Sequence, residues 1–284
     1  MSATRVVRLM ADDAEPPGVF RSARGPARNQ IDPSSTKWPI SGSFLGLVAA
    51  MVGLAAFMVV RPEFARLAVF AFVLVGWLIS LCLHEFGHAV AAYSCGDTSV
   101  RDKGYLTLDP LRYTNVQFSI LWPVIFLAIG GIGLPGGAVY VNMRALAKPT
   151  YRILVSAAGP LATLAVLILL LAVEHAAGSA LMASPPLHAA LAFLAFLQLT
   201  ALIFNLLPIP GLDGWGIVAP MLPRAFQETG ARLTGIAPAL LLLAFLFVPA
   251  VNQMFWRLVF DLSQMSGLDA KEAIRGLRLF QFWR

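Results

Sequence analysis

The chain has 284 residues, of which 58% are hydrophobic and only 13% are charged. Soluble domains average about 45–50% apolar and about 25% charged residues, so this composition excludes an ordinary soluble protein and predicts an integral membrane protein. The net charge of +6 does not indicate a nucleic-acid partner, because basic loops in a membrane protein usually report its topology. Two cysteines, Cys82 and Cys95, are too few for a disulfide framework.

The chain divides into two polar ends and a long apolar middle. Residues 1–37 are polar and rich in proline, and they predict a flexible cytosolic tail. Residues 38–251 predict a transmembrane core, and residues 252–284 predict an amphipathic, basic C-terminal tail. Since a span needs about 20 apolar residues, the expected spans are 39–60, 67–93, 117–134, 152–173, 187–207 and 233–251.

The segment 117–134 is apolar but is interrupted by Pro123 and by three glycines. It is consistent with a full span and with a re-entrant loop. The stretch "PGGAVYV" at 135–141 follows it and predicts a short strand, since it contains Val139, Tyr140 and Val141. The predicted fold class is therefore an all-α polytopic membrane protein with about five or six transmembrane helices. A short re-entrant or β element is expected near the active site.

Basic residues indicate the orientation of the spans. A cytosolic N-terminus makes the second span run from outside to inside, and Arg101, Lys103 and Arg112 follow it, as the positive-inside rule requires. The loop 174–186 has no lysine or arginine and is expected outside. One conflict concerns the C-terminal tail. The count of spans places it outside although it is basic, so either 117–134 crosses the membrane or the last apolar stretch does not cross cleanly.

The second span contains "HEFGH", which has the pattern H-E-x-x-H. On a helix the two histidines, His84 and His88, face the same way and can bind one metal ion. Imidazole suits zinc, and Glu85 beside the metal is then the general base. Charged residues inside a span are rare and indicate a functional site. The pattern therefore predicts a catalytic zinc site rather than two histidines and a glutamate brought together by chance.

A catalytic zinc site needs a third protein ligand. His175 and His188 flank the loop that is expected outside, far from the inner half of the second span. Asp213 is the better candidate, because it lies in "FNLLPIPGLDGWG" after a span that runs from outside to inside. Broken backbone at membrane depth is tolerated where it is buried or lines a wet cavity. The alternative for Asp213 is a turn aspartate that caps a helix.

These residues together resemble the site-2 protease family of intramembrane zinc metalloproteases (peptidase family M50), over roughly residues 67–220. The resemblance rests on "HEFGHA", on "SAAGP" at 156–160 and on "NLLPIPGLDG" at 205–214, in that order, and "PGGAVYV" is similar to a glycine-containing segment of the family. It implies one Zn²⁺ per chain, bound by His84, His88 and Asp213. It also implies that Glu85 is the catalytic base.

The resemblance further implies roles in substrate binding. Asn205 would hold the substrate backbone or the developing oxyanion; its alternative is a hydrogen bond between helices. Apart from the resemblance, a substrate helix must unwind before cleavage, and Gly136 and Gly137 would allow the unwound segment to approach and pair with "GAVYV" as an added strand; the alternative is an ordinary strand or loop. The small residues of "SAAGP" are expected to serve packing. "LTLDPLRYTN" at 106–115 departs from a similar family segment at Asp109, Tyr113 and Asn115, so the role of the histidine in that segment does not carry over.

The expected function is hydrolysis of peptide bonds in or near the transmembrane segment of a membrane-tethered substrate, such as an anti-sigma factor or another tethered regulator. The alternative is a non-proteolytic zinc-binding scaffold or transport protein on the same fold. No region is long and polar enough for the PDZ or CBS domains of many relatives, which indicates a compact form. The expected location is a bacterial plasma membrane, with the active site toward the cytosol.

Overall fold

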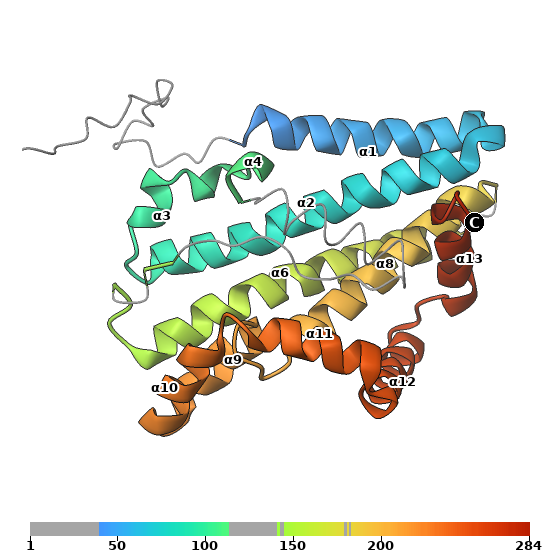
Figure 1. The fold of residues 1–284 in the computed structure, drawn as a ribbon. Helices are drawn as coiled ribbons and strands as arrows, with labels where there is room; N and C mark the ends of the chain where they lie inside the picture. The colour runs from blue at the N-terminus through green and yellow to red at the C-terminus, as the bar shows by residue number, and fades with distance from the viewer. Residues whose placement is uncertain (1–39, 114–140, 143–144, 179–180, 182) are drawn as a thin grey trace, which may run out of the picture. The chain divides into compact units, whose positions relative to one another are not determined.

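The computed structural model describes residues 40–113, 141–142, 145–178, 181 and 183–284 of the chain. All the regular elements within these ranges are helices (Figure 1). The predicted all-α polytopic class is therefore confirmed. The expected re-entrant or β element falls on 117–141, and all of it except Val141 lies outside the described residues, including Gly136 and Gly137.

Four of the described helices are long and apolar enough to cross a membrane. A fifth crossing results if α10 and α11, which meet at an angle of 73°, form one broken span. The expected span 233–251 does not correspond to one helix, because α11 ends at Phe247 and Pro249 starts α12. The four long helices are α1 (Gly42–Val60), α2 (Ala65–Ser94), α6 (Pro149–Ala176) and α8 (Pro185–Asn205).

Shorter helices connect and flank the spans. Those on the N-terminal side of α6 are η2 (Pro62–Phe64), α3 (Ser99–Asp102), η3 (Tyr105–Thr107) and α4 (Pro110–Tyr113). Those after α8 are α9 (Asp213–Val218), η5 (Ala219–Met221), α10 (Arg224–Leu233), α11 (Ala237–Phe247), α12 (Pro249–Ser266) and α13 (Ala270–Phe280).

Helix α8 is the centre of the bundle. In the most apolar stretch of α8, 78% is buried inside the protein. The corresponding share for α1 is 11%, so α1 lies at the periphery. Helix α8 packs against α6, α2 and α13, and the side chains of Phe193, Leu194 and Leu197 are fully buried there. Helix α2 packs against α6 along its length, as Figure 1 shows. The three helices α2, α6 and α8 therefore form the frame that positions the polar residues of the core.

The C-terminal helix α13 closes the end of the bundle where α2 begins. The main chain at Gly276 packs directly on the Ala189 carbonyl near the start of α8, and the Arg66 guanidinium donates to the Arg284 carbonyl. One face of α13 is buried on α8 and the other carries exposed Lys271 and Arg275. The amphipathic tail thus lies at the opposite end of α2 from the HEFGH motif.

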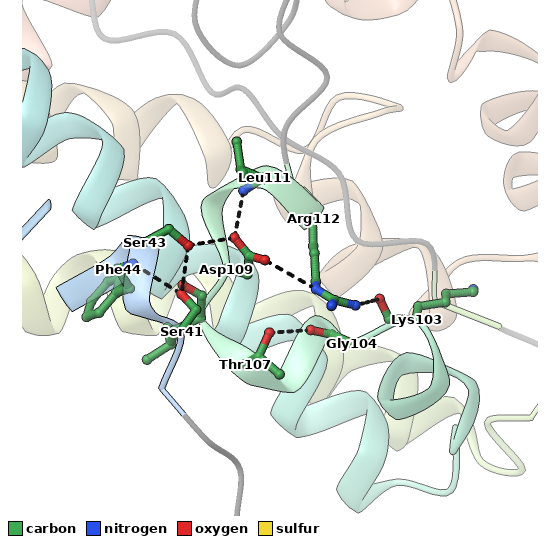
Figure 2. A network of polar contacts seen from close by, with 10 residues as sticks. Ser41, Ser43, Phe44, Lys103, Gly104, Thr107, Asp109, Leu111 and Arg112 are labelled. Carbon is green, nitrogen blue, oxygen red and sulfur yellow. Dashed lines mark hydrogen bonds and ion pairs between the residues drawn. The ribbon is translucent and has the colours of Figure 1, made fainter. Parts of the chain in front are cut away.

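A polar network joins the start of α1 to the segment that follows α2 (Figure 2). Asp109 accepts hydrogen bonds from the Ser43 hydroxyl at 2.9 Å, the Leu111 amide at 3.2 Å and the Arg112 guanidinium at 3.3 Å. The Ser41 amide donates to the Thr107 carbonyl at 2.9 Å. The network fixes the N-terminus of α1 on the loop at residues 104–112.

Candidate metal centre

Two histidines on the α6-facing side of α2 begin the site. His84 and His88 are one helical turn apart, so their rings lie on the same face of α2. Their ring centroids are 4.8 Å apart and their Nε2 atoms are 3.1 Å apart. The helical spacing alone therefore brings two metal-binding nitrogens to one point.

Asp213 reaches the same point because the chain reverses after α8. Pro208 cannot continue the helix, and Gly211 has a φ of +96°, a value that favours glycine. The main chain at Gly214 then packs directly on the carbonyl of Leu206 at the end of α8. Helix α9 consequently starts beside the end of α8, with Asp213 in its first turn.

The three side chains converge with the spacing of a metal site. An Asp213 carboxylate oxygen lies 3.2 Å from the Nε2 atom of His84, and the other lies 3.3 Å from that of His88. Zinc bonds of about 2.0–2.1 Å in a tetrahedron separate neighbouring ligand atoms by roughly 3.3 Å, which these distances match. Among the residues that the structure describes, this is the one group whose ligand atoms lie within 4.8 Å of one another.

The other ring nitrogens of the histidines have partners that suit zinc binding. His88 Nδ1 lies 2.7 Å from the main-chain carbonyl of Val155, which can only accept a hydrogen bond. His84 Nδ1 lies 2.9 Å from the Thr163 hydroxyl. When Nδ1 carries the proton, Nε2 keeps its lone pair for a metal. The distances between the three side chains suit a zinc ion, and so do the hydrogen-bond partners of the two Nδ1 atoms.

Helix α6 forms one wall of the site. A Cβ atom built at Gly159 would lie 2.7 Å from the Nε2 atom of His84 and closer still to that of His88. Only the absence of a side chain at Gly159 leaves room for the ligand atoms beside α6. The same helix holds α9 in place, since the main chain at Gly216 packs on the Ser156 hydroxyl. The "SAAGP" stretch thus packs helices, as expected, and it also shapes the metal site.

The electrostatics favour an ionised aspartate. Burial raises the pKa of the Asp213 carboxyl, but the neighbouring His84 and His88 side chains outweigh burial and hold that pKa well below its usual range. A carboxylate must be deprotonated to bind a metal. Asp213 is therefore already in the state that coordination requires.

Glu85 lies next to the ligands without being one of them. Its side chain is buried, and it is close enough to His88 to interact with it electrostatically. It does not belong to the group of three converging ligands. The position is suited to a carboxylate that exchanges a proton with a water molecule at the metal.

The remaining candidates from the sequence lie elsewhere. Asn205 is the last residue of α8 and is buried. Gly136 and Gly137 lie outside the described residues. His175 in the last turn of α6 and His188 in the first turn of α8 do not belong to the group of His84, His88 and Asp213.

Sequence reasoning missed Thr163, the Val155 carbonyl and the wall at Gly159. A signal for the wall was present, because Ser156, Gly159 and Thr163 are spaced three and four residues apart and so share one face of α6. A face of small residues marks a close helix contact in a membrane. The sequence does not say that the partner of this face is α2.

Comparison with known proteins identifies relatives. The profile of Peptidase family M50 matches residues 71–248. The chain is 45% identical to the zinc metalloprotease Rip2 of Mycobacterium tuberculosis over 262 residues, which cover 90% of this chain and 96% of that protein. It is 41% identical to Rip2 of Mycolicibacterium smegmatis over 269 residues, which cover 91% of this chain and 97% of the relative.

A more distant relative is the zinc metalloprotease YwhC of Bacillus subtilis, which is 32% identical over 163 residues. The match covers 55% of this chain and 72% of YwhC. No solved structure matches the chain.

Proposed function

Since the chain belongs to peptidase family M50 and is an integral membrane zinc metalloprotease, we propose that His84, His88 and Asp213 bind its zinc ion. We further propose that Glu85 is the catalytic base. The observation that carries this proposal is the convergence of the two Nε2 atoms and one carboxylate within 4.8 Å, inside an otherwise apolar bundle. A buried group of this kind is costly unless a cation binds it.

The chemistry follows from the residues around that point. Zinc, when bound, polarises a peptide carbonyl and lowers the pKa of a coordinated water molecule. A carboxylate oxygen of Glu85 takes a proton from the attacking water and gives it to the amide nitrogen that leaves. Val155 and Thr163 keep the histidine rings oriented during this exchange.

Two further elements would handle the substrate. A transmembrane helix hides its carbonyls in its own hydrogen bonds, so it must unwind before a peptide bond can be attacked. In this proposal Gly136 and Gly137 allow the unwound segment to approach "GAVYV" and to pair with it as an added strand. Asn205 holds the substrate backbone or the developing oxyanion. Asn205 is the last residue of α8, and α9, which carries Asp213, starts beside that end of α8; this proximity supports the role.

The orientation of the site in the membrane is also a proposal. His84 and His88 lie in the second half of α2, and the basic residues Arg101, Lys103 and Arg112 follow that helix. Because cytoplasmic loops carry an excess of basic residues, we infer that the metal centre faces the cytosol of a bacterial cell. Helix α13 then lies toward the outer face, although it is basic.

The substrate class follows from the location of the site. A metal centre inside a helical bundle is accessible to a segment that itself crosses or enters the membrane. We infer that the substrates are membrane-tethered proteins, with single-pass anti-sigma factors or other tethered regulators as the specific candidates. Water would reach the metal centre from the broken backbone that joins α8 to α9.

The decisive experiment replaces Glu85 by glutamine in the full-length protein. The change keeps the size of the side chain and removes the base, so we expect cleavage of a transmembrane substrate to fall by about 10²–10⁴-fold with zinc still bound. Cleavage is measured in proteoliposomes and zinc by atomic spectroscopy. A zinc-loaded Glu85→Gln protein that cleaves at the wild-type rate would falsify the proposed role.

Comparative proteomics of membranes that contain wild-type or Glu85→Gln protein identifies the substrates. Tethered proteins that accumulate intact only with the variant are candidates. If the accumulating proteins are all soluble, the inferred substrate class is wrong.

A further inference from the structure

Thr163 is a buried polar residue that contacts a proposed metal ligand from another helix. It lies on α6 with 4% of its surface exposed, and its hydroxyl oxygen lies 2.9 Å from His84 Nδ1. The His84 side chain is itself only 10% exposed, so water has little access to this hydrogen bond. Thr163 is therefore the partner of the Nδ1 atom of His84, as Asp213 is the partner of its Nε2 atom.

The direction of this hydrogen bond decides whether His84 can bind a metal. If Nδ1 carries the proton and donates it to the hydroxyl, the lone pair of Nε2 faces the Asp213 carboxylate, which lies 3.2 Å away. If the hydroxyl donates instead, Nε2 carries the proton and cannot coordinate a cation. The hydroxyl of a threonine rotates, so it can accept from Nδ1 as well as donate to it.

The two histidines differ in what fixes their tautomers. His88 Nδ1 faces the main-chain carbonyl of Val155 at 2.7 Å, and a carbonyl can only accept. No side-chain substitution removes that acceptor directly. His84 has a side-chain hydroxyl in the corresponding place. Of the two ligands on α2, His84 is thus the one whose orientation depends on a single replaceable atom.

We propose that Thr163 is a positioning residue of the metal centre, whose hydroxyl accepts the His84 Nδ1 proton and so presents Nε2 to the zinc ion. The inference rests on the proposed zinc site and adds a residue outside the ligand set. Thr163 acts through His84 and does not touch the metal or the substrate. Its effect is on zinc affinity first and on peptide hydrolysis only as a consequence.

The test compares three variants of the full-length, detergent-solubilised protein. Thr163→Val keeps the shape and removes the acceptor, so we expect zinc affinity to fall about 10–100-fold, the range typical of outer-shell partners. Thr163→Ser restores a hydroxyl and should regain most of that affinity. Thr200→Val is the matched control, because Thr200 is equally buried on α8 but bonds the Leu197 carbonyl, and its zinc affinity should equal that of the wild type.

Zinc affinity is measured by competition with a chromophoric chelator, and the cobalt(II)-substituted proteins are compared by their visible absorption spectra. We expect an altered cobalt spectrum for Thr163→Val and wild-type spectra for Thr163→Ser and Thr200→Val. Wild-type affinity in Thr163→Val overturns the inference. So does a loss in Thr163→Ser as large as that in Thr163→Val, because packing rather than the hydroxyl would then be responsible.

A fourth variant separates this inference from the proposed function. His84→Ala removes a proposed ligand, so zinc should be lost whatever Thr163 does. If His84→Ala retains tight zinc binding, the proposed metal site itself is wrong. If His84→Ala loses zinc while Thr163→Val binds it normally, the site stands and the role of Thr163 is refuted. Melting temperatures measured without zinc show whether each variant is folded.

Discussion

The metal centre and the Asp109 network are both polar clusters built from residues far apart in the chain, but they are completed in different ways. In the network of Figure 2, three donors from Ser43, Leu111 and Arg112 meet the carboxylate of Asp109. Donors match acceptors, and Ser43 and Arg112 are exposed to solvent. The hydrogen-bonding groups of this cluster are therefore paired with one another and need no bound ion.

The metal centre gathers acceptors instead. Once each Nδ1 atom donates to its partner on α6, the Nε2 atoms of His84 and His88 and the carboxylate of Asp213 all present lone pairs to one point. Lone pairs that converge in a buried place repel one another unless a cation lies between them. The two clusters are equally polar in kind, but only one of them matches donors with acceptors. That match, rather than polarity, distinguishes a structural network from a ligand site.

Removing Asp213 should break the metal centre most completely. Asp213→Ala deletes one of the three proposed ligands, so we expect zinc affinity to fall more than about 100-fold, beyond the range for outer-shell partners. Hydrolysis should be lost with the metal. Zinc content after gel filtration and chelator competition measure the effect. Unchanged stoichiometry and tight binding would show that another residue is the third ligand.

Adding one methyl group at Gly159 tests the wall of the site. In Gly159→Ala the new Cβ would collide with the Nε2 atoms of His84 and His88, so the ligands must move apart and zinc affinity should drop at least as much as in Thr163→Val. Gly53→Ala is the matched control, because, apart from the adjacent part of its own helix, no atom of the described residues lies within 4 Å of a Cβ at that position. That control should bind zinc normally and be about 0.5–1 kcal/mol more stable. Equal zinc affinities in the two variants would contradict the assigned wall.

Breaking the Asp109 network should have the smallest effect. Asp109→Ala removes the acceptor of exposed or half-exposed donors that water can satisfy, so the free energy of unfolding should fall by about 1 kcal/mol or less. Zinc affinity should not change, since the network carries no proposed ligand. Thermal denaturation and chelator competition check both outcomes. A large loss of zinc in this variant would mean that the Asp109 network and the metal centre are coupled and not independent.

Composition made most of the fold class predictable, and the H-E-x-x-H motif predicted two of the three proposed ligands, His84 and His88. Apolar stretches of about 20 residues indicate membrane helices without reference to any neighbour, and α1, α2, α6 and α8 lie where such stretches occur. The last apolar stretch was harder to interpret, because length and hydropathy do not reveal a bend. The structure divides that region between α11 and α12 and packs the basic tail at the far end of α2.

The shared face of His84 and His88 on a membrane helix follows from the sequence alone, because four residues make about one turn whatever surrounds them. The sequence pointed to Asp213 through a helix-breaking loop and a family resemblance. Only the tertiary structure decided that Asp213 meets both Nε2 atoms, that Gly159 leaves the space for them, and that Thr163 and Val155 face the other ring nitrogens. Those contacts depend on how α6 and α9 pack against α2, and such packing depends on side chains distant in the chain rather than on local spacing.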